Sequence, residues 1–164
     1  MDFDLKQASK EINEIMWRNH KTLSTAESCT AGRISGVITA VPGSSNYYMG
    51  GVTCYADHTK TQLLGVDAKI IEEQTPVCED VVVAMVKGCN ALFHTDYCIA
   101  ISGYAGPGGS QNGSVLVGTI WIAVGSGEDI VTCKIEEDNG RDQNLASATS
   151  KAIHMLLDYL HNHE

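Results

Sequence analysis

Residues 97–109 read Y-C-I-A-I-S-G-Y-A-G-P-G-G, and this stretch indicates the class of fold. Tyr97 to Ser102 is a nearly continuous apolar run of strand length, which is typical of a strand buried on both faces. Such strands occur where helices cover both sides of a sheet, so the run favours an α/β fold. The glycines that follow Ser102 allow a ligand to approach the backbone closely. The stretch therefore predicts a central strand that ends in a candidate ligand-binding loop.

Helical and strand patterns alternate on both sides of this stretch. Apolar residues at helical spacing predict helices at Leu5–Arg18, Ala31–Ala40, Thr59–Leu64, Ala68–Gln74, Glu79–Phe93 and Ser147–Leu160. Short β-leaning or apolar runs predict further strands at Thr22–Ala26, Tyr47–Tyr55, Ser114–Val124 and Ile130–Ile135. No repeat or linker-like segment interrupts the pattern. We therefore expect one domain over residues 1–164, folded as a three-layer α/β/α sandwich with a mixed sheet.

Composition narrows the function classes. The chain has 164 residues, 43% of them hydrophobic, and a formal net charge of −9. A non-specific nucleic-acid surface needs clustered Lys and Arg, so the charge argues against nucleic acid and favours a small molecule or a protein as partner. No apolar run reaches the roughly 20 residues that span a bilayer, and the first residues lack the pattern of a signal peptide. We therefore expect no membrane partner and a cytoplasmic protein.

Six cysteines are scattered along the chain without a C-x-x-C pair. This spacing gives little support to a zinc site or a redox dithiol, so we expect no metal. The simpler interpretation is reduced thiols that act as small apolar residues in the core.

Three polar, turn-rich segments are candidates for a site. In Thr25–Gly32, Ser28 and Thr30 could cap the following helix, whose free amides could bind a phosphate or an oxyanion. An ordinary N-cap without a ligand is the alternative. In Ser102–Gly109, the alternative to a ligand loop is a flexible connection. In Asn139–Asp142, Arg141 could contact an anion or be an ordinary surface arginine.

The sequence pattern alone does not select a catalytic pair. The six histidines lie in polar or terminal contexts, which argues against a Ser-His-Asp arrangement. A lysine could act as the base if burial or nearby charge favours its neutral form. Lys60 is a candidate, but spacing does not distinguish it from Lys87 or Lys151.

Taken together, these segments resemble the CinA C-terminal family. The stretch T-A-E-S-C-T-A-G at 25–32 is similar to the family's TAESCTGG or TAESLTAG signature. Further matches follow in order along nearly the whole chain: V-P-G-S-S at 41–45, G-V-T-C-Y-A-D at 51–57 with Lys60, L-L-G-V at 63–66, G-Y-A-G-P-G-G at 103–109, V-G-T-I-W at 117–121 and G-R-D at 140–142.

The resemblance implies a stand-alone form of this domain and an enzyme without metal or cofactor. Active members deamidate nicotinamide mononucleotide, a pyridine nucleotide, to nicotinate mononucleotide and ammonia. By position, Ser28 corresponds to the nucleophile and Lys60 to the base, and Tyr55 orients the base or relays the proton. The remaining positions implied in substrate binding are Cys29, Thr30 and Ala31, whose amides are candidates for an oxyanion hole, with Ser102, Gly103, Gly106 and Arg141. Some related proteins dimerise, so the resemblance also implies a homo-oligomer.

Three departures from the family pattern bear on activity. Asp57 replaces the usual Asn, and its charge near Lys60 favours the ammonium form, which is a poorer base. Tyr104 replaces a small aliphatic residue in the glycine-rich loop and could crowd the site. Residues 143–146 read Q-N-L-A and lack arginines often found there. Two alternatives therefore stay open: a catalytically impaired homologue that binds a nucleotide-like ligand, and an amidase for another small amide.

Overall fold

A five-stranded mixed sheet forms the centre of the computed structural model, which describes residues 1–163. Its strands are β1 (Leu23–Glu27), β2 (Tyr48–Thr53), β3 (Tyr97–Gly103), β4 (Thr119–Ser126) and β5 (Asp129–Glu136). They lie in the order β2-β1-β3-β4-β5. The first three in this order are parallel, whereas β4 runs antiparallel to both β3 and β5. The predicted mixed sheet is confirmed.

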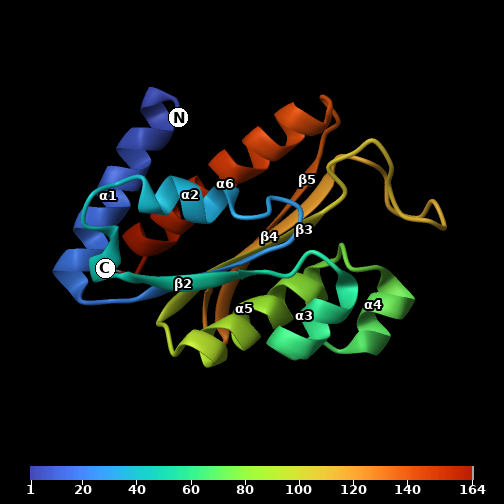
Figure 1. Cartoon of the computed structure of the whole chain (residues 1–164), viewed down its shortest axis with the longest axis horizontal. Coiled ribbons are helices and arrows are strands. Elements are labelled where there is room, and N and C mark those ends of the chain that lie inside the picture. The colour runs from blue at the N-terminus through green and yellow to red at the C-terminus, as the bar shows by residue number, and fades with distance from the viewer. Residues whose placement is uncertain (164) are drawn as a thin grey trace.

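Helices cover both faces of the sheet, which confirms the three layers (Figure 1). One face carries α1 (Phe3–Asn19), α2 (Arg33–Thr39) and α6 (Arg141–His161). The other carries α3 (Asp57–Leu64), α4 (Ala68–Gln74) and α5 (Glu79–Phe93). A short 3₁₀ turn, η1 (Ser44–Asn46), leads into β2.

Side-chain alternation along the central strands explains this layering. Ile99 and Ile101 of β3 face the core beneath α1, α2 and α6, whereas Cys98 and Ala100 face α5. Successive strand residues point to opposite faces, so bulky residues fill one core and small residues allow α5 to approach the other face. Both clusters consist of buried side chains, and their packing fixes the sheet between the two helical layers.

Backbone geometry moves several predicted boundaries. The helix predicted at Ala31–Ala40 begins at Arg33, because Ala31 and Gly32 adopt left-handed φ values of 47° and 97°. The strand predicted at Ser114–Val124 begins at Thr119, because Gly118 is also left-handed (φ 89°) and a Cβ there would lie 2.3 Å from the Glu137 carbonyl oxygen. A strand pattern read from apolar residues cannot detect such a turn.

The last helix begins earlier than its apolar stripe suggests. The prediction was Ser147–Leu160, but α6 starts at Arg141, so the segment that precedes the predicted helix forms its first turns. Polar residues such as Gln143 occupy the exposed side of these turns and carry no hydrophobic periodicity. The other predicted elements occur within a few residues of their expected positions.

All six cysteines are free, and Cys54, Cys89 and Cys98 are buried in the core between α5 and the sheet. No helix within residues 1–163 is long and apolar enough to cross a membrane.

Candidate active site

The parallel strands β2, β1 and β3 end side by side at one edge of the sheet. Glu27, the last residue of β1, is level with Thr53 of β2 and with Ile101 of β3. The chain leaves β1 towards β2 through α2 on one face, and returns to β3 through α3, α4 and α5 on the other. Ligands bind in open α/β sheets where strand order reverses in this way, at the carboxyl ends. Ser28 follows β1 directly at this position.

A cavity of about 230 Å³ opens at this edge, and we call it the reaction cavity. It is lined by Ser28, Cys29, Tyr55, Asp57, Lys60, Pro76, Val77, Ser102, Gly103, Tyr104, Ala105, Gly106, Gly108 and Arg141. The structure therefore brings together eight of the ten predicted site residues, from the ends of β1, β2 and β3 and the start of α6. Thr30 and Ala31 do not line it.

Ser28 is buried and fixed by its main chain. Its amide donates to the Ile101 carbonyl oxygen at 3.1 Å, and its own carbonyl accepts from the Ala31 amide at 3.1 Å. The turn from Ser28 to Gly32 therefore closes back on itself before α2 begins. Among the described residues, the Ser28 hydroxyl makes no hydrogen bond, so it is available in the reaction cavity.

The start of α2 is occupied by Glu27, a residue that our sequence analysis did not select. Its buried carboxylate accepts from the Ile34 amide at 2.9 Å and the Ser35 amide at 3.0 Å. It also accepts from the hydroxyls of Thr30 and Ser35, both at 2.7 Å. A carboxylate at a helix N-terminus satisfies free amides and complements the helix dipole.

The predicted caps are therefore wrong. Gly32 is the N-cap residue of α2 and makes no side-chain cap. The Thr30 hydroxyl donates to Glu27, and Ser28 lies in the cavity instead of at the helix end. Because Glu27 holds the first amides of α2, this helix end does not offer the phosphate site that the sequence suggested. The sequence offered one signal for this role: Glu27 directly follows a predicted strand and stands three residues before Thr30, whose hydroxyl it binds.

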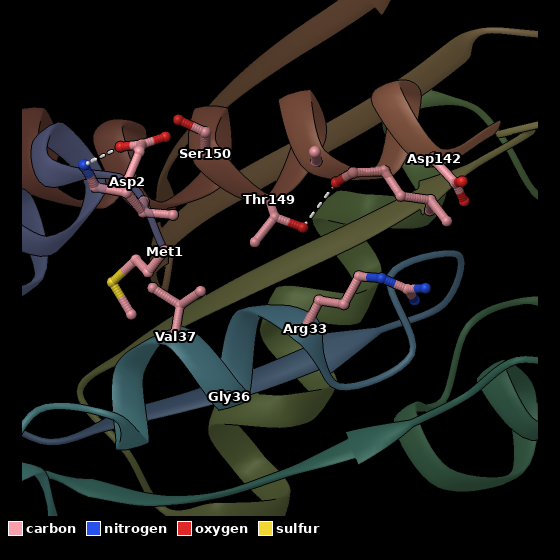
Figure 2. A pocket seen from close by; sticks show the side chains of 11 residues that line it. Met1, Asp2, Arg33, Gly36, Val37, Asp142, Thr149 and Ser150 are labelled. Atoms are coloured by element: carbon pink, nitrogen blue, oxygen red, sulfur yellow. Dashed lines mark hydrogen bonds between the residues drawn. The ribbon is translucent and has the colours of Figure 1, made fainter. Parts of the chain in front are cut away.

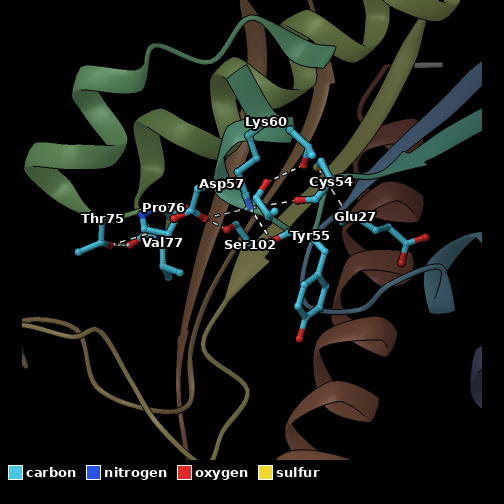
Figure 3. Close-up of polar contacts among 11 residues, drawn as sticks. Glu27, Cys54, Tyr55, Asp57, Lys60, Thr75, Pro76, Val77 and Ser102 are labelled. Carbon is cyan, nitrogen blue, oxygen red and sulfur yellow. Dashed lines mark hydrogen bonds and ion pairs between the residues drawn. The ribbon is translucent and has the colours of Figure 1, made fainter. Parts of the chain in front are cut away.

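Lys60 on α3 is only 1% exposed, and its ammonium is surrounded by oxygens. Nζ donates to the Cys54 carbonyl at 3.0 Å and to the Tyr55 carbonyl at 3.4 Å. The Asp57 carboxylate lies 3.6 Å from the same nitrogen (Figure 3). The structure thus distinguishes Lys60 from Lys87 and Lys151, neither of which lines the cavity.

Tyr55 contacts Lys60 through its main chain, whereas its phenol points away from the lysine (Figure 3). The ring is 58% exposed, and its hydroxyl accepts from Arg141 Nη2 at 3.4 Å. Arg141 also donates through Nη1 to the Gly106 carbonyl. Arg141 therefore joins α6 to two loops at the rim of the reaction cavity.

Ser102 and Gly103 form the floor of the cavity at the end of β3. The Ser102 hydroxyl donates to the Pro76 carbonyl at 2.9 Å, which holds the segment between α4 and α5 against the sheet. Gly103 has no space for a larger residue, because a Cβ there would lie 2.5 Å from the Ile120 side chain. The glycine is thus required by close packing at this point.

Cys29 is next to Ser28 and is the other potential nucleophile in the cavity. Burial raises the pKa of its thiol to about 11, with Lys60 lowering it only in part. Since the thiolate is the reactive form, Cys29 is almost entirely an unreactive thiol at neutral pH. Ser28 is therefore the stronger candidate nucleophile in this turn.

Asn144 occupies part of the segment where arginines were expected. Its side-chain amide nitrogen donates to the Ala105 carbonyl at 2.9 Å and to Asp138 at 3.0 Å. Its oxygen accepts from the Asn139 amide at 2.8 Å. Asn144 thus fixes the glycine-rich loop against the start of α6, and among the described residues Arg141 is the one arginine that lines the cavity.

A separate cavity of about 450 Å³ lies between α1, α2 and α6 (Figure 2). Its walls are mainly aliphatic, with Arg33 and Asp142 at one end. The Arg33 side chain donates to the Thr30 carbonyl at 3.0 Å, within the turn from Ser28 to Gly32. Within residues 1–163, no group of three or more His, Cys, Asp or Glu side chains is placed to hold a metal ion.

The family assignment follows from a comparison with known sequences. The profile of the CinA C-terminal domain matches residues 5–160, which is nearly the whole chain. The chain belongs to the CinA C-terminal domain family. A CinA-like protein from Cytophaga hutchinsonii is 34% identical over 94% of this chain, and one from Mycobacterium marinum is 41% identical over 83%. The matched parts are 37% and 32% of those proteins' own lengths, so the chain spans well under half of each.

Solved CinA structures share the fold over nearly their full length. The CinA superfamily protein from Klebsiella pneumoniae 700603 matches with a TM-score of 0.91 and 29% identity, covering 96% of this chain and 98% of that one. The competence/damage inducible protein CihA from Agrobacterium tumefaciens matches with a TM-score of 0.91 and 26% identity, covering 96% of both chains. These likenesses confirm the α/β architecture of the CinA domain.

Proposed function

We propose that this CinA domain hydrolyses the carboxamide of nicotinamide mononucleotide to nicotinate mononucleotide and ammonia. The observation that carries the proposal is the meeting of Ser28 and Lys60 in one cavity, from separate parts of the chain. Both residues occur in the segments that resemble the family signature. A hydroxyl nucleophile beside a buried lysine is the arrangement that Ser-Lys acyl transfer requires.

The proposed reaction has two steps. The Ser28 oxygen attacks the amide carbon while the neutral amine of Lys60 takes the hydroxyl proton. The C–N bond then breaks, Lys60 returns the proton to the departing nitrogen, and ammonia leaves a nicotinoyl ester on Ser28. Water attacks this ester with Lys60 again accepting a proton, and the proton passes to the Ser28 oxygen as nicotinate mononucleotide departs.

Backbone amides near Ser28 are the candidates for stabilising the oxyanion that forms in each step. The amides of Ser28 and Ala31 already donate to carbonyl oxygens. The amides that remain in this turn are those of Cys29 and Thr30, and of these two residues only Cys29 lines the reaction cavity. Preorganised donors of this kind contribute a large share of the rate in acyl transfer.

Arg141 is the group we assign to the phosphate of the substrate. It lies at the rim of the reaction cavity and carries the charge and the planar donor geometry that suit a phosphate. Its present contacts with Tyr55 and Gly106 would have to rearrange or be shared when the phosphate binds. The remaining predicted positions, Ser102, Gly103 and Gly106, would contact the ring and ribose.

The test is ammonia release from nicotinamide mononucleotide by the purified protein, alongside Ser28→Ala and the matched exposed variant Ser147→Ala. We expect release by the wild type and Ser147→Ala, and a loss of about a thousandfold or more in Ser28→Ala. A nicotinoyl adduct on Ser28, trapped by acid quenching of the wild type during turnover and seen by mass spectrometry, would add support. Undiminished release by Ser28→Ala would refute the mechanism.

One observation favours the second candidate, a CinA homologue that binds a nucleotide-like ligand without turnover. Among the described residues, no hydrogen bond links Lys60 to Ser28, and the ammonium instead contacts two carbonyls and Asp57. Saturable nucleotide binding by calorimetry, with no ammonia released from this or another small amide, would select that candidate. Dimer formation and a cytoplasmic location stay predictions, the former to be checked by light scattering.

A further inference from the structure

A second cavity of about 540 Å³ adjoins the reaction cavity, and we call it the outer cavity. It is lined by Asp57, Ile71, Glu72, Thr75, Pro76, Tyr104, Gly109, Ser110, Gln111 and Asn112. Asp57, Pro76 and Tyr104 line both cavities. These three residues are therefore the wall between the two spaces, and Tyr104 contributes the largest side chain to it.

Tyr104 is held firmly at its base. Its amide donates to the Thr119 carbonyl at 2.9 Å, and its own carbonyl accepts from the Gly118 amide at 2.7 Å. These bonds extend the pairing of β3 and β4 by one residue beyond Gly103. The backbone of Tyr104 is thus part of the sheet, and the side chain starts from a fixed position.

The phenol end of Tyr104 lies near Thr75, at the end of α4, and near Asp57. Burial raises the pKa of its hydroxyl, the Thr75 side chain lowers it in part, and the charge of Asp57 raises it further. Thr75 has a left-handed φ of 77°, an unusual conformation for a β-branched residue, and its hydroxyl accepts from the Val77 amide at 3.2 Å. The next residue, Pro76, is tied to Ser102. The Tyr104 side chain thus extends from the end of β3 towards the segment of Thr75 and Pro76, which is itself held in place.

The two cavities differ in charge. The reaction cavity contains Lys60 and Arg141 in addition to Asp57. The outer cavity has Asp57 and Glu72 and, among the described residues, no lysine or arginine in its walls. The negative charge disfavours the binding of a phosphate in the outer cavity. An uncharged group with hydroxyls could bind there to Ser110, Gln111 and Asn112.

We propose that Tyr104 is the specificity-determining residue of this CinA site: it closes the reaction cavity on the side of the outer cavity and restricts the acyl group to a single small ring. The inference rests on the proposed amide hydrolysis for its substrate. Replacing Tyr104 by Ile should join the two cavities and admit an amide whose ring carries an uncharged hydroxyalkyl group.

The first experiment measures the size of the cavity without requiring turnover. Cys29 lines the reaction cavity, and at alkaline pH a larger fraction of its thiol is ionised, so its alkylation there by iodoacetamide and by a bulky aryl-substituted iodoacetamide reports the space around it. We would follow both rates by peptide mass spectrometry in the wild type, Tyr104→Phe and Tyr104→Ile. Cys78 lines a different cavity and is the internal control on the same molecules.

We expect Tyr104→Ile to raise the bulky-to-small rate ratio at Cys29 by about tenfold, the size of a relieved steric clash of a few heavy atoms. Tyr104→Phe keeps the ring, so its ratio should stay within about twofold of the wild type, and the ratio at Cys78 should not change in either variant. An unchanged ratio at Cys29 in Tyr104→Ile would overturn the proposal.

The second experiment compares kcat/KM for nicotinamide mononucleotide with that for its hydroxyalkyl-substituted analogue. Tyr104→Ile should raise the relative kcat/KM of the analogue by about tenfold, and Tyr104→Phe should leave it unchanged. A wild type that releases no ammonia from either compound refutes the proposed hydrolysis. The alkylation ratios at Cys29 still decide whether Tyr104 is the wall, so the two failures are distinguishable.

Discussion

In the parallel half of the sheet, β2, β1 and β3 all end at the edge where the reaction cavity opens, whereas in the antiparallel half β4 begins at that edge and β5 ends there. Ser28, Tyr55 and Ser102 follow or end strands of the parallel half. The central part of β4 contributes Ile122 and Val124 to the core instead. The candidate site residues are thus collected where strands end together, and the antiparallel strands supply burial.

The same contrast appears in how each half is stabilised. In the parallel half, the buried Glu27 carboxylate accepts from amides at the start of α2, and the buried Lys60 ammonium donates to the Cys54 carbonyl. In the antiparallel half, the side chains of β5 largely alternate between exposed and half-buried positions. Substitutions in the two halves should therefore separate activity from stability, and four variants test this.

The largest effect is expected from Lys60→Met. The variant keeps the length of the side chain but removes the proposed base, so kcat should fall by about a hundredfold to ten-thousandfold. Lys87→Met, an exposed lysine of α5, is the matched control and should retain activity. Ammonia release measures both variants. Equal activity in Lys60→Met and Lys87→Met would show that Lys60 takes no part in the reaction.

Val124→Ala should affect stability and leave the chemistry unchanged. Val124 is fully buried in β4, towards the strand end that is remote from the reaction cavity. Removing two methyl groups from this core should lower the free energy of unfolding by about 2 kcal/mol. Urea unfolding gives this value, and kcat/KM of the folded variant should match the wild type. A large fall in kcat/KM would show that the two halves are coupled.

Glu27→Gln should lower both the free energy of unfolding and kcat/KM. The replacement amide can accept through only one oxygen, so part of the donor set at the start of α2 loses its partner. Buried donors left unpaired cost about 1–3 kcal/mol. The turn that carries Ser28 should become less ordered, which lowers kcat more than it raises KM. Glu73→Gln, at an exposed position of α4, is the control. Full activity in Glu27→Gln would limit the role of Glu27 to folding.

Asp57→Asn should give the smallest effect. The carboxylate lies 3.6 Å from Lys60 Nζ, and its replacement removes one of the groups that contact this nitrogen. Asp57 is more than half exposed and solvent screens its charge, so the rate of ammonia release at pH 7 should change by less than about fivefold. A much larger change would show that Asp57 has a role beyond this screened contact.

The sequence predicted the architecture well because the spacing of apolar residues reflects secondary structure, which depends on residues close together in the chain. The apolar run at Tyr97–Ser102 and the stripe at Glu79–Phe93 form β3 and α5 at nearly the expected bounds. The errors occurred where the backbone turns for reasons that the pattern does not encode. The left-handed Gly118 delays β4, and the polar first turns of α6 carry no apolar stripe.

The sequence predicted which residues belong to the candidate site better than it predicted how they are arranged. The resemblance selected Ser28 and Lys60, and both line the reaction cavity. The role of Glu27 as the α2 cap was missed, since a capping carboxylate that reaches forward from a strand has no standard spacing. Tyr104 was noted as a departure, but its position between two cavities depends on the fixed segment at Thr75, which is distant in sequence.

The order of the strands also has a consequence for how the chain folds. β3, β4 and β5 are consecutive neighbours, whereas β1 reaches β3 only by contacts such as that between Thr22 and Asp96, which are 74 residues apart. Closing a long loop costs entropy before its contacts form, so the local meander should assemble ahead of the β1–β3 pairing. The turn that carries Ser28 is joined to Ile101 by that pairing. Ser28, the proposed nucleophile, would then be placed late in folding, after most of the antiparallel core is already buried.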